Sequence, residues 1–414
     1  MSRFNTIYSG LVLLLISACS NSLEEEGRHF FNKIEEDGIE VAVTSDVPYF
    51  ASPLFEYEEI LRLQEDEDQP ESLLFRPSIF YLGDDGRYYV EDNGNHRIAI
   101  FGSDGVYNHA IGREGEGPGE FRTSPDILWI AEGQIFVFDR SLRRTTLFSF
   151  DGTLINTYSS PVSASSSGVY PIDSDRFLIL TATSEGGINE NRVTTSVALI
   201  VSVEGDTLCS LTTPGYTNSK MMFLPDINMG LQIIQPLAER AGFFYRFDQR
   251  IMSYHTGKPD LLWYDTRGQL VRKVTMDIEH APVSDPERVA IIGRLDRRIT
   301  DADNDRRRAM TRATREGTVI PEYKPYWMSV QVDEYGFLWL ERVYDSTIPT
   351  SERGPATYMI LSPEGEYLGD NVHPHTRGNV SRGHFLAITT DPETDKIDLV
   401  VYRMIPVPGG FSYH

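Results

Sequence analysis

The chain has 414 residues, of which 40% are apolar and 24% are charged, and its formal net charge is −23. This composition is typical of a globular protein, and so acidic a chain is not expected to bind nucleic acid or to adhere to anionic lipid. There are two cysteines; if Cys19 is modified, Cys209 has no intrachain partner, so no disulfide framework is expected and Cys209 is interpreted as a buried apolar residue.

Residues 1–18 have the pattern of an export signal. Arg3 supplies positive charge, Leu11 to Ile16 form an apolar run, and small residues lead directly to Cys19. The run is shorter than the about 20 residues that a membrane-spanning helix needs. The segment resembles the lipobox of bacterial lipoproteins, which implies cleavage before Cys19 and a lipid on its thiol. By the same resemblance, Ser20 favours the outer membrane; an ordinary secretory signal is the alternative.

Residues 19–38 are polar and acidic, and we interpret them as a tether that would hold a folded domain away from the membrane. The globular domain is predicted to extend from residue 39 to residue 414. Within residues 39–64, an early strand is expected to complete the last repeat of the domain. The reason is that the C-terminal repeat lacks a strand, and closing it would remove a free sheet edge.

The clearest strand pattern of the domain lies in residues 79–122. Two short strands, Arg87–Glu91 and Arg97–Phe101, flank the polar turn Asp92–Asn95, and a glycine-rich loop follows at Gly112–Gly119. Six such units follow one another along the chain, the first at residues 78–111 and weaker copies at 126–158, 169–211, 231–278, 327–370 and 384–405. A repeat of about 40–50 residues is typical of propeller blades. The pattern therefore predicts an all-β fold, a six-bladed β-propeller.

Residues 284–317 interrupt the strand pattern, which predicts a helical insertion between blades four and five. Ser284–Glu287 has the sequence of a capping box, and apolar residues follow at helical spacing, as in one bent helix or a helical hairpin. The segment holds nine arginines, which could dock a partner or pair with the protein's own acids. Aromatic residues follow, which suit a recognition surface or the blade core. The candidate partner surface consists of Arg297, Arg298, Arg306, Arg307, Arg308, Tyr323, Tyr326 and Trp327.

Several of these motifs point to a family. Tyr88–Asp92, Asn95–Ile98 and the loop that follows are similar to an NHL-type repeat. The whole chain resembles the six-bladed β-propeller lipoproteins of Bacteroidetes-like bacteria in its lipobox, its Gly115–Phe121 loop, its charged helical insertion and its proline-rich entry to the next strand. This resemblance implies a fold and a membrane-anchored location, but it implies no established reaction.

Polar residues at strand ends are candidates for a site in the central channel. Propeller lactonases and amidating lyases, which resemble this chain in architecture, hold a metal there through side chains from several blades. The candidates here are Asp92, His96, Asp139 and Asp333, all of which also suit the capping of turns. No cofactor is identified by these residues, and calcium or zinc is the metal that such a site would take.

Two further motifs have a structural and a functional interpretation. His373 and His375, with His384 nearby, could chelate zinc or lie in a solvated loop. The stretch Gly112–Glu120 lacks the Lys-Ser/Thr of a phosphate loop and carries three glutamates, so it is interpreted as a connection between blades, with a cation site as the alternative.

Taken as a whole, the patterns favour a non-catalytic binding or scaffold module of the cell envelope that recognises a protein or glycan partner. The motivating features are the anchor, the repeats and a segment rich in arginine and aromatic residues. The alternative is a metal-dependent propeller hydrolase or lyase, similar to lactonases, with its site in the central channel. A third hypothesis is an electrostatic or mechanical spacer within an envelope assembly.

Overall fold

The structure is a computed structural model that describes residues 28–66, 68–159, 166–246, 249–390 and 397–408. The expected signal peptide, Cys19 and the first part of the expected tether lie outside these residues. In the described part of the chain, the strands form six sheets that follow one another along the sequence. No helix of that part is long and apolar enough to cross a membrane.

The first two sheets have four antiparallel strands each. The first contains β4 (Pro77–Leu82), β5 (Tyr88–Asp92), β6 (Arg97–Phe101) and β7 (Tyr107–Ile111). The second contains β8 (Pro125–Ala131), β9 (Gln134–Asp139), β10 (Arg144–Ser149) and β11 (Leu154–Ser159). The turns between strands carry Asp-Gly pairs at several places, and glycines such as Gly105 and Gly152 adopt a positive φ there.

The third and fourth sheets are larger, with six strands each. The third contains β12 (Ser166–Pro171), β13 (Arg176–Glu185), β14 (Asn191–Ser202), β15 (Thr207–Thr212), β16 (Tyr216–Leu224) and β17 (Met229–Ile234). The fourth contains β18 (Ala241–Arg246), β19 (Arg250–His255), β20 (Asp260–Tyr264) and β21 (Leu270–Asp277), together with β2 (Ile39–Ser45) and β1 (Phe31–Glu36). Because β16 and β17 belong to the third sheet, the fourth repeat begins at residue 241 and not at the expected 231.

The last two sheets have four strands each, and the sixth closes the fold. The fifth contains β22 (Val330–Val332), β23 (Leu338–Glu341), β24 (Thr357–Leu361) and β25 (Tyr367–Val372). The sixth contains β26 (Gly378–Ser381), β27 (His384–Thr390) and β28 (Ile397–Pro406), and its outer strand is the early β3 (Phe55–Arg62). β3 runs antiparallel to β28. The prediction that an early strand completes the last repeat is therefore confirmed.

Six buried apolar clusters join each sheet to the next and the last to the first. Pairs of residues that represent these interfaces, in chain order from the first sheet, are Ile98 and Ile135, Phe138 and Val169, Ile200 and Ile251, Val274 and Leu338, Trp339 and Phe385, and Leu399 and Val90. Each sheet thus buries its two faces against two neighbours. The result is a closed ring, a six-bladed β-propeller.

Regular structure begins nearer to the N-terminus than expected. β1 lies within residues 19–38, which were interpreted as a tether, and it pairs with β2. The turn between the two strands is Asp37-Gly38, and both residues have a positive φ, as a tight hairpin requires. β2 in turn runs parallel to β21, so the hairpin extends the outer edge of the fourth sheet.

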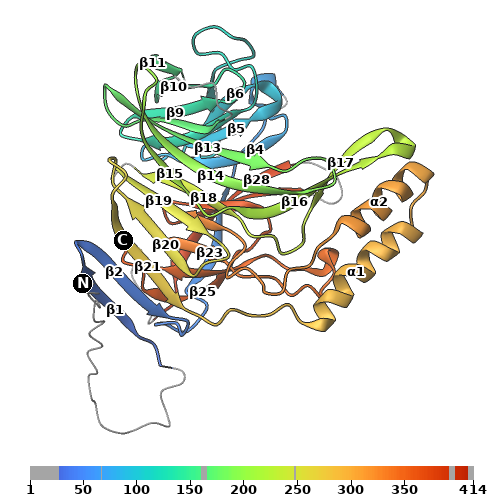
Figure 1. Cartoon of the computed structure of the whole chain (residues 1–414). Coiled ribbons are helices and arrows are strands. Elements are labelled where there is room, and N and C mark those ends of the chain that lie inside the picture. Colours follow the sequence, from blue (N-terminus) through green and yellow to red (C-terminus); the bar gives the residue numbers. More distant parts are fainter. Residues whose placement is uncertain (1–27, 67, 160–165, 247–248, 391–396, 409–414) are drawn as a thin grey trace, which may run out of the picture.

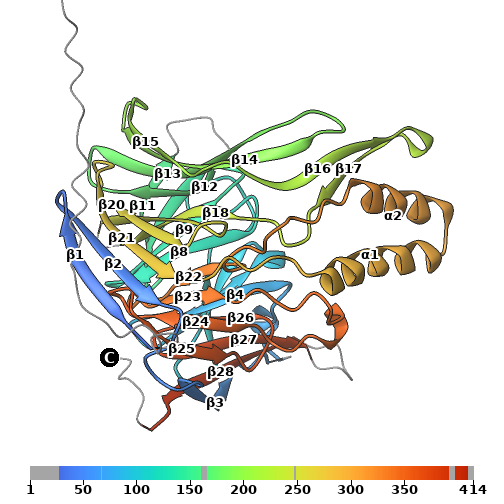
Figure 2. The ribbon, with the colours of Figure 1, turned by 60° about the horizontal axis from the view of Figure 1, so that its bottom comes forward.

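An arm projects from one side of the ring. It consists of β16 and β17, the outer ends of β13 and β14, and the helices α1 (Asp285–Thr300) and α2 (Asp305–Gly317), which lie between β21 and β22 in the chain. Figures 1 and 2 show the two helices side by side beneath the β16–β17 hairpin, away from the centre of the ring. The expected capping box is present at the start of α1, where Ser284 accepts from the Glu287 amide and Glu287 accepts from the Ser284 amide.

Candidate functional site

A groove lies between the helices and strand β17 in the arm, with a cavity volume of about 360 Å³. Its apolar lining residues are Leu231, Leu295, Ala302 and Met310. The exposed side chains of Arg298 and Arg307 line it as well, together with one exposed acid, Asp301. Such a groove can accept apolar side chains of a bound segment while the two guanidinium groups pair with its anionic groups.

The groove keeps its shape because the end of α2 is clamped to the end of β17. Gln235 donates from Nε2 to the Gly317 carbonyl at 3.1 Å, and its Oε1 accepts from the Val319 amide at 2.7 Å. Gly317 itself is required for this approach, since a Cβ there would lie 2.4 Å from the Ile233 side chain and 2.6 Å from that of Met222. No local sequence pattern indicates this contact, because residues 235 and 317 are far apart in the chain.

Many of the nine arginines of residues 284–317 have partners within the molecule. The short contacts are Arg288 to the Pro321 carbonyl (2.8 Å), Arg294 to the Ser346 carbonyl (2.6 Å), Arg308 to Asp305 (2.7 Å) and Arg315 to Asp296 (3.1 Å). Arg306 and Arg307 make longer contacts, with Met229 Sδ and Asp303, both at 3.5 Å. Within the described residues, the side chains of Arg297, Arg298 and Arg312 have no hydrogen bond or ion pair to another side chain or to the backbone. This segment therefore contains both arginines that pair with groups of the protein itself and arginines that are available to a partner.

The aromatic residues of the expected partner surface differ in exposure. Tyr323 is 44% exposed, and its ring stacks on His280 at 4.7 Å. Tyr326 also stacks on His280, with the ring centroids 4.5 Å apart. Trp327 is fully buried in the cluster between the fourth and fifth sheets, so it belongs to the blade core and not to a surface.

The carboxylates of two channel candidates accept hydrogen bonds from groups of their own blades. Asp92 accepts hydrogen bonds from the Phe75 amide and from Arg97 Nε, both at 2.7 Å. Asp139 accepts from the amides of Arg122 at 2.6 Å and Leu142 at 2.8 Å. Each carboxylate is fully buried and satisfies backbone donors that would otherwise lack an acceptor.

Of the other two channel candidates, Asp333 lies apart from Asp92 and Asp139, whereas His96 lies in the same turn as Asp92. Asp333 caps the turn between β22 and β23, where it accepts from the Phe337 amide and from Trp339 Nε1, both at 3.0 Å. The turn at Asp333 follows the first strand of its sheet, whereas Asp92 and Asp139 lie at the ends of second strands. Because neighbouring strands of a blade run in opposite directions, Asp333 lies at the opposite end of the blades from Asp92 and Asp139. His96 has a φ of 53° and ends the turn after β5. Among the described residues, no three His, Cys, Asp or Glu side chains are grouped as a metal site.

The three histidines near the C-terminus have separate surroundings. His373 is buried between Tyr358 and Phe385, and its Nδ1 lies 3.0 Å from the Tyr57 hydroxyl. Burial lowers the pKa of His373 to about 3, so the ring is neutral in the folded protein. His375 bonds to the Tyr402 hydroxyl at 2.7 Å, and His384 Nδ1 lies 2.9 Å from the Arg382 carbonyl. The structure does not bring the three rings together.

The glycine-rich loop connects β7 to β8. Gly112 has a φ of 81°, and a Cβ there would lie 2.2 Å from the buried Phe121 ring. Arg144 donates to the carbonyls of Glu116 and Glu120 at 3.0 and 2.7 Å, while Glu120 accepts from the Gly117 amide at 2.8 Å. These contacts give the loop the geometry of a connection between blades, with close backbone approach at its glycines.

A buried acid between the first two sheets was not singled out from the sequence. Glu91 accepts from the Ser78 hydroxyl and from the Ile127 amide, both at 2.7 Å, and is 5% exposed. Burial raises its pKa to about 8. In the sequence, Glu91 is an ordinary polar residue at a strand end, and only the packing of the second sheet against it shows its burial.

The comparisons with known proteins agree with this architecture. A family model described as a 6-bladed beta-propeller matches residues 72–221, a stretch that holds the first two sheets and most of the third. No curated protein matches the sequence. The expected resemblance to bacterial six-bladed propeller proteins is confirmed at the level of the fold.

Solved structures of Bacteroides proteins are similar over most of the chain. A protein of Bacteroides fragilis named as a predicted exported protein matches 88% of this chain and 99% of its own, with a TM-score of 0.50 and 10% identity. A member of the DUF4221 family from Bacteroides vulgatus matches 85% of this chain and 99% of its own, with a TM-score of 0.44 and 13% identity. Virginiamycin B lyase of Staphylococcus aureus matches 85% of this chain and all of its own, with a TM-score of 0.35 and 10% identity. At such identities the likeness concerns the fold alone.

Proposed function

We propose that the protein is a non-catalytic binding module of the cell envelope, anchored in the outer membrane through Cys19, and that its arm recognises a protein partner. The observation that carries this proposal is the groove of the arm, which combines an apolar lining with Arg298 and Arg307. Arginine is enriched among the residues that contribute most to the binding energy of protein interfaces, where such residues lie in well-packed pockets.

The charge of the helical segment of the arm indicates the chemistry of the partner. Residues 284–317 contain nine arginines and seven acidic residues, a formal charge of +2 within a chain of net charge −23. Opposite potentials steer two proteins toward each other and disfavour partners of like charge. We therefore expect the bound segment to carry acidic residues next to apolar ones.

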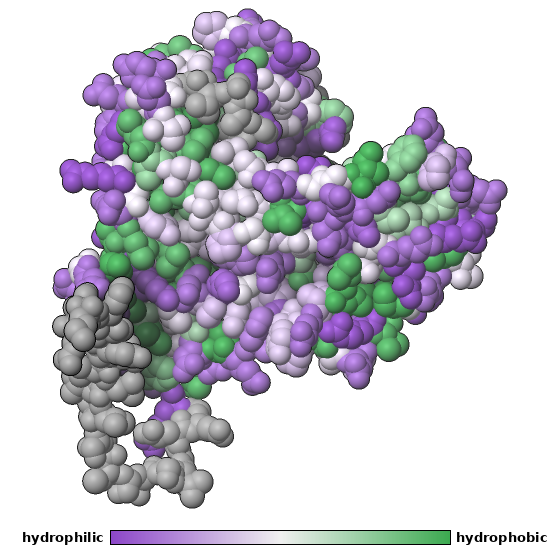
Figure 3. Space-filling view, viewed as in Figure 1, coloured by the Kyte–Doolittle hydropathy of each residue, from purple (hydrophilic) through white to green (hydrophobic). Residues whose placement is uncertain are grey.

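The arm also leaves large apolar side chains in contact with solvent. Val289 on α1 is 71% exposed, Ile188 beyond the end of β13 is 67% exposed, and Ile234 at the end of β17 is 64% exposed. Figure 3 shows apolar side chains interspersed with polar ones over this projection. Single exposed apolar residues are common on any protein, but several on the projection that also holds the groove favour a recognition role.

Site-specific photo-crosslinking in intact cells tests the proposal. A photoreactive phenylalanine analogue replaces Thr311, which lines the groove, and in a matched protein it replaces Thr153, an exposed threonine in the turn between β10 and β11. We expect a crosslinked species of defined mass from position 311 and none from position 153. Protease digestion of the attached mass identifies the partner as protein, whereas a protease-resistant mass would point to a glycan and contradict the proposal.

Charge variants sharpen the same experiment. Arg298→Glu should weaken the crosslink at position 311, because it places a like charge against an acidic partner. Arg267→Glu, an equal charge change at an exposed turn between β20 and β21, should leave it unchanged. The proposal fails if both positions give the same species, if neither gives any, or if Arg298→Glu has no effect.

The metal-dependent hydrolase or lyase stays a prediction from the resemblance to lactonases and lyases. Its test is independent of the arm. The test is elemental analysis of the purified protein, followed by activity measurements on small lactones with added calcium or zinc. A stoichiometric metal together with turnover would support this function, and the absence of both would contradict it.

A further inference from the structure

A second cavity of about 360 Å³ lies where three neighbouring sheets of the ring approach one another. The fourth sheet contributes its edge strand β18 and the adjacent β19, the third sheet contributes β13 and β14, and an arginine follows β9 of the second sheet. The lining residues used below are Arg140, Leu180, Ala182, Ser196, Phe244 and Tyr254. This volume is in the range of small-molecule sites.

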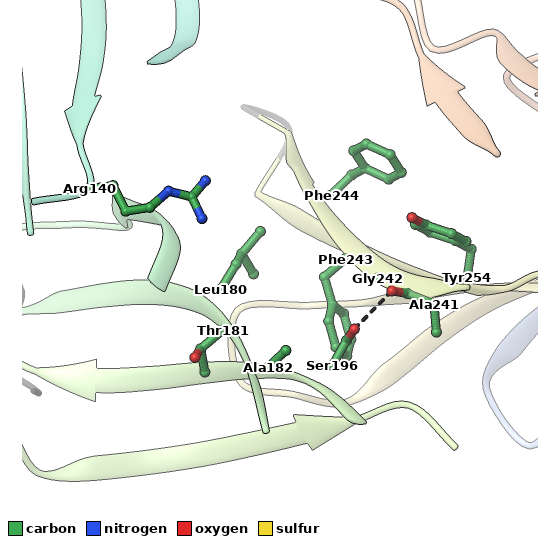
Figure 4. Close-up of a pocket in the computed structure, with 10 residues that line it drawn as sticks. All are labelled: Arg140, Leu180, Thr181, Ala182, Ser196, Ala241, Gly242, Phe243, Phe244 and Tyr254. Atoms are coloured by element: carbon green, nitrogen blue, oxygen red, sulfur yellow. Dashed lines mark hydrogen bonds between the residues drawn. The ribbon is translucent and has the colours of Figure 1, made fainter. Parts of the chain in front are cut away.

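One side of the cavity is cationic. Figure 4 shows the Arg140 guanidinium reaching into the cavity, with Leu180 beneath it. Its contact with Asp126 is loose, since the nearest nitrogen and oxygen are 3.8 Å apart and the two side chains are 59% and 41% exposed. Burial raises the pKa of Asp126 despite the nearby guanidinium, so this carboxylate is a poorly stabilised partner. An anionic ligand could therefore approach Arg140 without displacing a strong ion pair.

The other side of the cavity is flat and apolar. The rings of Phe244 and Tyr254 stack with their centroids 5.5 Å apart and an interplanar angle of 25°. In Figure 4 both rings lie across the cavity from Arg140. Gly242 allows this arrangement, because a Cβ at that position would lie 2.9 Å from the Tyr254 ring.

The walls of the cavity are fixed to each other. Ser196 on β14 donates from its hydroxyl to the Ala241 carbonyl on β18 at 2.8 Å, and this bond is buried. It joins the third sheet to the fourth at the cavity itself, as the dashed line in Figure 4 marks. A preformed pocket costs a ligand less ordering than a mobile one does.

We propose that this cavity binds a small planar organic anion, with its anionic group on Arg140 and its flat apolar body against Phe244 and Tyr254. The combination of one guanidinium group with a stacked aromatic pair selects an aromatic carboxylate over an inorganic anion, which would leave the apolar wall unused. This binding site is separate from the groove of the arm and does not depend on a protein partner.

Titration of the purified full-length protein with 2-naphthoate, followed by its fluorescence and by calorimetry, tests the proposal. We expect saturable binding of 2-naphthoate at one site. The neutral 2-naphthamide should bind at least about tenfold more weakly, because the loss of one charge-assisted contact weakens binding by about that factor. Arg140→Gln should weaken 2-naphthoate binding to a similar extent. Arg143→Gln, which removes the same charge at an exposed position of the same turn, should not.

A charge-neutral variant locates the site. Ala182→Phe adds a bulky side chain to the cavity lining and leaves the charge of Arg140 in place, so it should abolish binding of 2-naphthoate, while circular dichroism and unfolding show that the ring is intact. Absence of saturable binding to the natural protein, equal binding by Arg140→Gln, or full binding by Ala182→Phe would each overturn the proposal. None of these results bears on the crosslink from the arm, so the two proposals fail separately.

Discussion

The ring and the arm are stabilised by different kinds of interaction. The ring is built on apolar clusters in which residues such as Trp339, Ile98 and Val400 are fully buried. In the arm, α2 has only Ala313 and Gly317 buried, and its position depends on polar contacts such as the Gln235 clamp and the Arg315–Asp296 ion pair. Buried apolar area supplies most of the free energy of folding, whereas exposed ion pairs supply little.

Because of this difference, one part of the molecule can change in sequence without loss of the fold, and the other cannot. A six-sheet ring closed by β3 resists local opening, because each sheet is packed on both faces. The arm contacts the ring along few buried residues, and regions with few buried apolar contacts open most readily. A recognition surface on the arm can therefore vary in sequence and in local order while the ring keeps its shape.

The largest expected effect comes from truncation at a ring interface. Trp339 is fully buried, stacks on Phe55 at 6.0 Å and donates from Nε1 to Asp333. Trp339→Ala should lower the free energy of unfolding by about 3–5 kcal/mol, because it leaves a cavity and removes one hydrogen bond from the buried Asp333 carboxylate. Urea unfolding followed by circular dichroism measures it. Val289→Ala on the arm is the control, and a loss there as large as that of Trp339→Ala would erase the distinction between the regions.

A smaller effect, dependent on pH, concerns the buried acid between the first two sheets. The pKa of Glu91 is raised from 4.5 to about 8, so the folded protein favours its protonated form. The stability gained from that proton is complete below pH 4.5 and is lost as the pH rises through about 8. Glu91→Gln keeps the shape and hydrogen-bonding capacity of the neutral acid. It should therefore be more stable than the natural protein by about 3 kcal/mol at pH 7 and no more stable at pH 4.

The measurement is the free energy of unfolding in urea across this range of pH. Glu114→Gln, at an exposed glutamate of the glycine-rich loop, serves as the control and should give parallel curves. A constant difference between Glu91→Gln and the natural protein at all pH values would mean that Glu91 is ionised in the folded ring.

Local patterns in the sequence were enough to predict most of the ring. Strand alternation, Asp-Gly turns and a shortage of one strand at the C-terminus led to six blades and to closure by an early strand, which β3 provides. The capping box at Ser284 was equally local. These features are set by residues a few positions apart, so they are visible before any packing is known.

The arm and the sites could not be predicted in the same way. β14 is twelve residues long, and its outer end pairs with β16, a choice of edge partner that depends on tertiary packing. Both sites are lined by residues that are far apart in the chain. Leu231 and Met310 line the groove, and Arg140 and Tyr254 line the cavity of the ring. The channel candidates were chosen as polar strand ends, yet Asp92, Asp139 and Asp333 each complete a turn of their own blade. A side chain that caps a turn and one that faces a ligand look alike until the fold is known.

The smallest expected effect tests whether the arm opens by itself. Ser284→Ala removes the capping box of α1, which should cost about 1 kcal/mol, but only in the stability of that helix. Amide hydrogen exchange should therefore quicken about fivefold in residues 285–291, while amides in β5 and β9 keep their rates. Ser284→Asp, which keeps a side-chain acceptor at the cap, should restore the natural rates. If the amides of the ring quickened to the same extent, the arm and the ring would unfold as one unit, and the freedom of the arm to vary would be lost.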